Sequence, residues 1–445
     1  MNRRSDAGRG LHRKRMAAAC FALCLAGASW LRAAESSSNW TGFQDGGRVQ
    51  VKQLPESWNS DGTNIAWSAD IEGYGQSSPV VYGNHVYITS TSGPSKDKYH
   101  LACLSLADGK KQWQLSFDNP TPVENNSYVS RAAPSPVVTE SAVIASFEGG
   151  IAVAVSHAGN VIWQKNLVNE YGAITSRHGL AASLEQDDKS VYIWIERDAE
   201  PYLLALRKTD GAVAWKVDGL GATSWASPRL INVASKPHLV CSASGRIVGF
   251  HPEDGRRLWE FTELSNNTTC TPIPIADGRF LIGASEGRTE TPGQNPAASN
   301  GVIEVTAQTD GSFQVGYVWR AEKAASSFGS PIVAAGSVWI VNRSGALYQL
   351  DAATGKQQSI GRTAAGSIWA TPLATSEKLY LFGQKGTTSI IDLKSAKEVQ
   401  SCSTWSGGNQ ETPAASGGQV LYAAVAAGPD LLIRRGDKLF AVRQK

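Results

Sequence analysis

Short hydrophobic segments alternate with polar residues along nearly the whole chain, and many of them end in a similar turn. The recurring unit is an apolar segment, a Gly that usually follows Asp, and a Trp four residues after the Gly. Alternation of period two is typical of half-buried strands, and Asp-Gly favours tight hairpin turns. Five copies keep the Trp, the last in stretched form: LACLSLADGKKQW (101–113), IAVAVSHAGNVIW (151–163), YLLALRKTDGAVAW (202–215), RIVGFHPEDGRRLW (246–259) and GVIEVTAQTDGSFQVGYVW (301–319). The pattern predicts antiparallel hairpins and almost no helix.

A second motif alternates with the first and marks where each group of strands begins. It is a small or polar residue, usually followed by Pro, and then a short apolar segment. Pro is tolerated at the first position of a strand because no ladder hydrogen bond is lost there. The eight copies are SSPVV (77–81), PSPVV (134–138), GLAAS (179–183), ASPRL (226–230), CTPIP (270–274), GSPIV (329–333), ATPLA (370–374) and ETPAA (411–415).

Eight units of roughly 45 residues, each with several short strands, are typical of a β-propeller. We therefore predict an all-β fold, an eight-bladed propeller of four-stranded antiparallel blades. The Trp of each unit starts an outer strand, and its ring can fill the wedge between neighbouring blades. Six Trp are assigned this structural docking role: Trp67, Trp113, Trp163, Trp215, Trp259 and Trp319.

The two ends of the chain suggest how the ring closes. An early copy, SDGTNIAW (60–67), has no inner strands before it, and the last unit has no such copy after it. The simplest arrangement pairs the N- and C-terminal strands, with residues 64–71 as the outer strand of the eighth blade. The alternative fills that blade with C-terminal strands alone, namely 412–416, 420–425, 431–435 and 438–443.

The N-terminus has the three-part pattern of a secretory signal peptide. Residues 1–15 are basic, residues 16–27 are apolar, and Ala26-Gly27-Ala28 fits a small-x-small cleavage site. An uncleaved anchor and lipid attachment at Cys20 are the alternatives. We divide the chain into a signal peptide (1–28), an N-terminal extension packing on the ring (29–63) and the propeller (64–445), and we expect it in the periplasm or secreted.

Charge and cysteine content limit the classes of partner and the covalent links that we expect. The net charge of +3 belongs to the leader, because removing residues 1–28 leaves 36 basic against 38 acidic residues. No basic body remains for nucleic acid, so nucleic acid is not an expected partner. The four remaining cysteines are far apart, and spacing cannot assign disulfides among them. We interpret them as buried thiols.

These repeats resemble the PQQ-like (pyrroloquinoline-quinone-type) propeller family, whose blades carry an Asp-x-x-(Thr/Asp)-Gly-Lys-x-x-Trp docking motif. The closest matches are ADGKKQW (107–113) and TDGAVAW (209–215), and the resemblance covers about residues 40–443. Two branches share this fold: quinoprotein dehydrogenases, and non-enzymatic scaffolds such as the propeller lipoprotein of the outer-membrane barrel-assembly machinery. Fold alone does not choose between them.

The dehydrogenase branch implies features that can be checked against the chain. Its members use a disulfide between adjacent cysteines, a stacking Trp, a Ca²⁺ held by Glu, Asn and Asp, and a catalytic Asp. No adjacent Cys pair, haem motif, HExxH, GxSxG or P-loop is present here. We therefore assign no catalytic residue and no metal ligand, and we expect no cofactor, with PQQ and Ca²⁺ as the alternative.

Residues just before each inner strand of a propeller line the mouth of the central channel, which makes them the candidate binding residues. Aromatic rings there suit stacking on a flat ligand or anchoring an extended peptide, although rings that merely plug a wide channel explain the same pattern. The candidates are Gln76, Arg131, Arg177, His178, Trp225, Phe328, Trp369 and Gln410.

The sequence thus favours an exported, non-catalytic propeller scaffold. We expect it to bind a protein or extended-chain partner of the cell envelope through its channel mouth and blade loops. A PQQ/Ca-dependent quinoprotein oxidoreductase is the first alternative. A polysaccharide-binding or lyase-type propeller is the second, for which Arg131, Arg177 and His178 are the clustered candidates.

Overall fold

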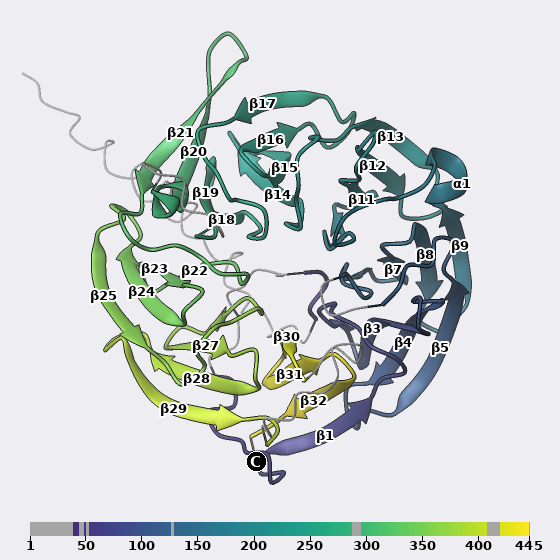
Figure 1. Ribbon diagram of the computed structural model, residues 1–445, viewed down its shortest axis with the longest axis horizontal. Helices are drawn as coiled ribbons and strands as arrows, with labels where there is room; N and C mark the ends of the chain where they lie inside the picture. The colour runs from purple at the N-terminus through teal and green to yellow at the C-terminus, as the bar shows by residue number, and fades with distance from the viewer. Residues whose placement is uncertain are drawn as a thin grey trace, which may run out of the picture. The chain divides into compact units, whose positions relative to one another are not determined.

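The computed structural model describes residues 39–43, 49, 53–125, 129–286, 295–406 and 419–444. All of these residues belong to one compact unit, Ser38–Lys445. Within them the strands form eight four-stranded antiparallel sheets arranged as the blades of a propeller (Figure 1). The predicted eight-bladed β-propeller is confirmed. Residues 1–28, expected to be the signal peptide, lie outside the described residues.

Each of the first four blades takes its strands from one continuous stretch of chain, in order from the axis outward. They are β2 (Val80–Tyr82), β3 (His85–Ser92), β4 (Lys98–Ser105) and β5 (Lys111–Asp118); β6 (Val137–Val138), β7 (Ala142–Ser146), β8 (Ile151–Ser156) and β9 (Val161–Asn166); β10 (Glu185–Gln186), β11 (Ser190–Ile195), β12 (Tyr202–Arg207) and β13 (Val213–Asp218); and β14 (Arg229–Val233), β15 (Lys236–Ala243), β16 (Arg246–Phe250) and β17 (Arg257–Phe261).

The next three blades repeat this order, and the eighth does not. They are β18 (Ile273–Ala276), β19 (Arg279–Ile282), β20 (Gly301–Ala307) and β21 (Phe313–Arg320); β22 (Ile332–Ala334), β23 (Ser337–Val341), β24 (Ala346–Asp351) and β25 (Gln357–Arg362); β26 (Leu373–Ala374), β27 (Lys378–Phe382), β28 (Thr387–Asp392) and β29 (Lys397–Ser403); and, for the eighth, β30 (Leu421–Ala427), β31 (Asp430–Arg435), β32 (Lys438–Val442) and β1 (Ile65–Asp70).

The eighth blade joins the two ends of the chain. Its strand order is β1-β32-β31-β30, so the N-terminal strand is the outermost and pairs antiparallel with the last strand. The predicted closure by N- and C-terminal strands is confirmed. The innermost described strand is β30, whereas the ETPAA segment, assigned above to the eighth inner strand, lies outside the described residues together with Gln410.

Within the residues that the structure describes, two short helical segments interrupt the strands. They are α1 (Leu167–Tyr171), which follows β9, and a 3₁₀ turn at Pro296–Ser299. The side chain of Asn166 caps α1 by accepting hydrogen bonds from the first-turn N–H groups. No helix in the described part of the chain is long and apolar enough to cross a membrane.

The indole of the outer-strand Trp joins one blade to the next at five junctions. Its ring covers the Gly of the next blade's turn, and its N–H donates to a carbonyl just before that Gly. Because Gly has no Cβ, the ring can approach the backbone closely. The bonds, all between 2.8 and 2.9 Å, are Trp67 to Leu106, Trp113 to His157, Trp163 to Lys208, Trp215 to Pro252 and Trp319 to Ala352.

Trp259 differs from the other five Trp residues. Its Nε1–H donates to Nδ1 of His238 at 2.9 Å, within its own blade, although its ring still stacks on Phe280 of the next blade. The reason lies in the lengthened hairpin of the fifth blade. An ideal Cβ at Gly311, the turn glycine there, would meet nothing within 4 Å, so that turn offers no surface for the ring of Trp259.

A chain of buried hydroxyl groups links the inner strands around the axis. Before five of the inner strands, the Ser or Thr two residues ahead of the strand accepts a hydrogen bond from the equivalent N–H of the preceding blade. This satisfies N–H groups that have no ladder partner. Five successive bonds of 2.8–3.0 Å run Ser78 to Ser135, Ser135 to Ser183, Ser183 to Ser227, Ser227 to Thr271 and Thr271 to Ser330.

Candidate functional site

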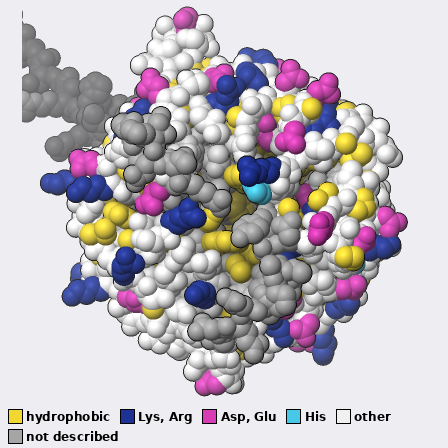
Figure 2. All heavy atoms as spheres, in the orientation of Figure 1, with side chains coloured by type: hydrophobic (Ala, Val, Ile, Leu, Met, Phe, Trp, Pro, Cys, Tyr) yellow, Lys and Arg dark blue, Asp and Glu magenta, His cyan; other side chains and the backbone are white. Residues whose placement is uncertain are grey.

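One cavity of about 470 Å³, counted to its open mouth, lies at the inner strands of the first and the fifth to eighth blades. We call it the axial cup. Figure 2 shows hydrophobic side chains gathered in a hollow at the centre of this face of the ring. Its lining consists of Trp40, Phe43, Ser78, Thr269, Phe328, Ser330, Trp369, Thr371, Pro372, Leu373, Tyr422, Ala423, Ala424 and Val425.

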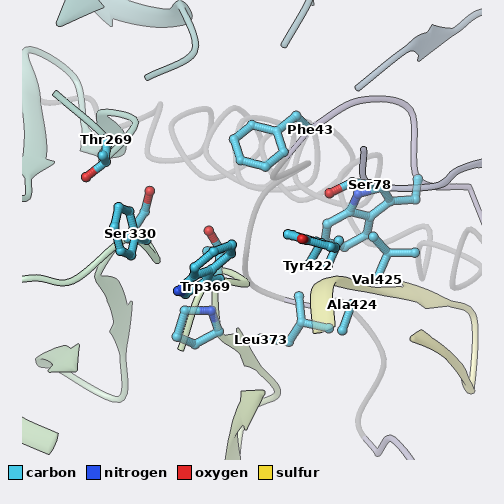
Figure 3. A pocket seen from close by; sticks show the side chains of 14 residues that line it. Phe43, Ser78, Thr269, Ser330, Trp369, Leu373, Tyr422, Ala424 and Val425 are labelled. Carbon is cyan, nitrogen blue, oxygen red and sulfur yellow. The ribbon is translucent and has the colours of Figure 1, made fainter. Parts of the chain in front are cut away.

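The base of the cup is formed by the segment before the first strand. Trp40 pairs with Val81 through two backbone hydrogen bonds of 2.8–2.9 Å, and Val138 donates to the carbonyl of Thr41. The guanidinium of Arg229 holds the carbonyl of Phe43 at 3.0 Å. Segment 39–43 therefore runs along the ends of inner strands and brings Trp40 and Phe43 into the lining of the cup, where Figure 3 shows Phe43.

Aromatic rings from successive blades form a continuous arc along one side of the mouth. Phe328 precedes β22 and lies 5.3 Å from Trp369, which precedes β26. Trp369 in turn lies 5.6 Å from Tyr422. Tyr422 meets Tyr74 edge-on at 6.0 Å, and their hydroxyls are 3.0 Å apart. Offset and edge-to-face contacts at these distances are favourable, so the rings support one another.

Tyr422 enters this arc through an irregularity of its strand. The register of β30 against β31 shifts between Leu421 and Ala423, which is a bulge at Tyr422. Bulges redirect a side chain, and here the ring of Tyr422 points into the cup (Figure 3). Burial and the neighbouring Tyr422 hydroxyl raise the pKa of Tyr74, so the Tyr74 hydroxyl stays neutral.

A second, smaller group of predicted mouth residues lies on other blades. His178 and Trp225, which precede β10 and β14, have ring centroids 5.8 Å apart. The N–H of Trp225 is fixed by the carbonyl of Thr268 at 2.7 Å. Arg177 is exposed beside His178. Neither Trp225 nor His178 is among the residues that line the axial cup.

Gln76 and Arg131 lie next to each other but are less accessible than mouth residues are expected to be. The N–H of Arg131 donates to the side-chain oxygen of Gln76 at 2.9 Å, and the N–H of Gln76 donates to the carbonyl of Arg131 at 3.1 Å. Arg131 is only 1% exposed. Its guanidinium lies 3.8 Å from the centre of the Tyr74 ring, in a cation–π contact at the end of the arc.

The structure therefore brings Phe328 and Trp369 together in the cup. Arg131 lies against Tyr74 at the end of the same arc, and its neighbour Ser130 donates to the carbonyl of His178 at 2.9 Å, whereas Trp225, His178 and Arg177 are not part of the cup lining. Tyr422, Trp40 and Tyr74 belong to the site and were missed. Trp40 was assigned only to the N-terminal extension. A hairpin turn at AAGPD (426–430) is the signal that would have marked β30 as an inner strand and Tyr422 as a mouth residue.

The chemistry of the described lining is that of recognition. It combines aromatic rings with Ser and Thr hydroxyls and includes no carboxylate, amine or imidazole. Among the described residues no three His, Cys, Asp or Glu side chains come together as a metal-binding group. Cys103, Cys241, Cys270 and Cys402 are free and buried, and burial raises the pKa of each thiol.

Comparison with known proteins gives two kinds of match. The family model described as outer membrane protein assembly factor BamB matches residues 28–194, 174–360 and 317–445. A BamB of Yersinia pestis is 24% identical over 238 residues, which is 53% of this chain and 55% of the relative. A polyvinylalcohol dehydrogenase of Sphingopyxis sp. is 24% identical over 274 residues, 58% of this chain and 39% of the relative. The chain thus spans about half the length of its curated relatives.

The similar solved structures are also of two kinds, a BamB and a dehydrogenase. The crystal structure of BamB from Moraxella catarrhalis covers 85% of this chain and 96% of its own, with a TM-score of 0.57 and 11% identity. The quinohemoprotein alcohol dehydrogenase of Comamonas testosteroni covers 92% of this chain and 81% of its own, with a TM-score of 0.58 and 11% identity. At such identities the likeness concerns the fold alone.

Proposed function

Because this chain belongs to the family described as outer membrane protein assembly factor BamB, we propose that it is a non-catalytic propeller scaffold that binds a protein partner in the cell envelope. The partner presents an extended segment to the axial cup and to the surrounding blade loops. Export by a cleaved N-terminal signal peptide, to the periplasm or beyond, is part of this proposal.

The observation that carries the proposal is the aromatic arc at the mouth of the cup. Phe328 is 48% exposed, and Trp369 and Tyr422 are half-buried. Large aromatic side chains fixed on a rigid propeller are suitable anchors. A partner buries much apolar area against them, and these side chains lose little conformational freedom on binding. The hydroxyls of Thr269 and Ser330, which lie beside the arc before β18 and β22, supply polar groups that orient an extended chain.

Blade edges add a second means of attachment. The outer strands β9 and β25 expose apolar side chains, among them Ile162 at 46% and Ile360 at 54%. An outer strand pairs with one neighbour only, so its other edge keeps free main-chain groups. A partner segment can extend such a sheet while another part of it occupies the cup.

A quinoprotein oxidoreductase is the second candidate, favoured by the similarity to a polyvinylalcohol dehydrogenase and to the fold of a quinohemoprotein alcohol dehydrogenase. The residues of the cup do not fit a quinone with Ca²⁺. Ca²⁺ prefers carboxylate and carbonyl oxygens, and the described lining has no carboxylate. We derive no redox step from this site.

Photo-crosslinking tests the scaffold proposal. A photoreactive amino acid replaces Phe328 at the mouth, and a control chain carries it at Val399, which is similarly exposed, at 50%, on the outer strand β29. We expect a discrete adduct in the cell envelope from position 328 that is lost when Trp369→Ala is added. Adducts of equal yield with and without Trp369→Ala would contradict binding at the cup.

A thermal-shift titration with PQQ and Ca²⁺ distinguishes the second candidate. A ligand at a hundred times its dissociation constant stabilises a protein by about 2.7 kcal/mol, which is a shift of a few degrees for a chain of this size. We expect no shift. A rise that Trp369→Ala abolishes would overturn the scaffold proposal in favour of a quinoprotein.

A further inference from the structure

The base of the axial cup holds a hydrogen-bond donor that the protein does not use. Trp40 lines the cup and is 5% exposed, and its Nε1–H has no acceptor among the described residues. The docking indoles of Trp67, Trp113 and Trp163 all donate to carbonyls at 2.9 Å. A buried donor without an acceptor is unfavourable, so an acceptor that reaches Trp40 is bound favourably.

A second unused donor group lies at the end of the aromatic arc. Nε, Nη1 and Nη2 of Arg131 are all without an acceptor in the described part of the chain, and the residue is 99% buried. The contact with Tyr74 occupies a face of the guanidinium and leaves the N–H groups at its edge unused. A buried cation in this state favours a negative group nearby.

The charges around Arg131 do not neutralise it. Glu148, the buried acid near this part of the chain, accepts from the N–H of Ala132 at 3.0 Å and from Nζ of Lys96 at 3.4 Å. Its charge is thereby paired with Lys96. The described lining of the cup adds no negative group. The region therefore has an excess of positive charge and of donors.

We propose that the axial cup binds a carboxylate of the partner chain, with Trp40 Nε1 as a donor at the base and the buried Arg131 as the compensating charge behind Tyr74 and Tyr422. This inference rests on the proposed scaffold function and specifies its ligand: an apolar segment that carries a carboxylate. The apolar side chain packs on Phe328 and Trp369, and the carboxylate turns toward the unused donors.

Three blocked peptides test this by isothermal titration calorimetry with the purified protein. They are acetyl-Gly-Leu-Gly-Leu with a free C-terminal carboxylate, the same peptide as its amide, and acetyl-Gly-Leu-Gly-Glu amide. The first supplies a terminal carboxylate, the third a side-chain carboxylate, and the second neither. We expect at least one acidic peptide to bind about tenfold or more tightly than the neutral amide, the strength of a hydrogen bond to a charged group.

Matched variants connect the preference to the proposed donors. Arg131→Met and Trp40→Phe each remove one donor group while keeping an apolar side chain, and we expect both to bring the affinities of acid and amide close together. Arg197→Met is the control. Arg197 is also buried, at 8% exposed, and lies over the ring of Tyr202, but its guanidinium already donates to the carbonyls of Glu200, Gly172 and Ala173. This variant should keep the preference for acid.

The outcomes separate the two proposals. If the unmutated protein binds all three peptides equally, the carboxylate inference is wrong and the scaffold function stands. If none of the three binds up to millimolar concentration, both are wrong. The comparison on the unmutated protein needs no variant, so it holds even if Arg131→Met does not fold. A preference that survives in both Arg131→Met and Trp40→Phe would place the carboxylate elsewhere.

Discussion

Tryptophan serves two separate purposes in this propeller, and its position in the repeat decides which. A Trp at the start of an outer strand, such as Trp163, packs its face on a glycine of the next blade and donates to a carbonyl there. A Trp before an inner strand, such as Trp369, packs at a tilt against rings of neighbouring blades and keeps part of its own ring in solvent. Solvent exposure at the second position is what makes Trp369 available to a partner.

His238 provides a test of stability against pH at the scale of one residue. It is buried and accepts a hydrogen bond from Trp259, and burial, with smaller contributions from His251, Arg256 and Lys236 against Asp277, lowers the pKa of His238 to about 4. Between pH 6.5 and 4 the unfolded chain therefore binds a proton at this site that the native protein does not.

The free energy of unfolding should fall over this interval, by roughly 2–3 kcal/mol from this residue. Urea unfolding at pH 7 and at steps down to pH 4.5 measures it. His238→Gln keeps an acceptor for Trp259 and removes the titration, so its stability should fall less steeply than that of the unmutated protein. Parallel curves for the two proteins would show that His238 titrates normally in the folded state.

Part of the site could be predicted residue by residue from the sequence. Phe328 and Trp369 were found because they stand at a fixed distance before a motif Pro. Tyr422 was missed because no motif Pro stands directly before the described inner strand β30, whereas the ETPAA copy of the motif lies outside the described residues. The burial of Arg131 could not be predicted, because it depends on Tyr74 from another blade lying over its guanidinium.

At the scale of elements, the tight turn between the third and fourth strands has two requirements that glycine meets together. At Gly211 the backbone has φ +69°, which side chains rarely adopt, and an ideal Cβ would lie 2.7 Å from Cδ2 of Trp163. At Gly311 φ is +85°, but a Cβ would meet nothing within 4 Å. Both turns have a positive φ that is unfavourable for a residue with a Cβ, but only the turn at Gly211 packs against a Trp ring.

Alanine at these two positions separates strain from packing. Gly311→Ala should cost about 1 kcal/mol of unfolding free energy, the penalty of a left-handed conformation with a Cβ. Gly211→Ala should cost about 1–3 kcal/mol more, because the methyl group pushes the indole of Trp163 off the turn. Chemical denaturation of both variants measures the difference. Equal losses would mean that the Trp–Gly contact adds little to the joining of the blades.

The hydrogen-bonded hydroxyl groups at the inner strands can be located in the sequence, but their role cannot be derived from it. Ser135, Ser183 and Ser227 all stand in the second motif, where a small or polar residue was noticed. Their role depends on adjacent inner strands lying close enough for a backbone N–H to reach a hydroxyl of the next blade. That distance is a property of the ring and cannot be derived from one repeat.

At the scale of the whole molecule, closure of the ring could be predicted because the two ends are complementary. The first Asp-Gly copy has an outer strand without inner ones, and the last unit has inner strands without an outer one. In the structure β1 pairs with β32 and supplies the fourth strand of the eighth blade. The path of segment 39–43 under the cup could not be predicted, because so short a stretch carries no periodic pattern.

A cross-link between the two ends tests the closure directly. Asp70 of β1 lies opposite Lys438 of β32, and their side chains form an ion pair at 2.6 Å. Both side chains lie at the surface of the blade, Asp70 almost fully exposed, so the pair contributes at most about 1 kcal/mol. Asp70→Cys with Lys438→Cys therefore replaces a weak contact by a covalent one at the point where the ring closes.

The oxidised double variant should be more stable than its reduced form by about 3–5 kcal/mol, because the bond closes a loop of several hundred residues in the unfolded chain. Urea unfolding with and without reductant measures the difference on one protein. The double variant Asp70→Ala with Lys438→Ala controls for the lost ion pair. If the disulfide forms only between two chains, β1 does not pair with β32 of its own chain. The propeller would then not close at the eighth blade, which carries Tyr422 of the aromatic arc.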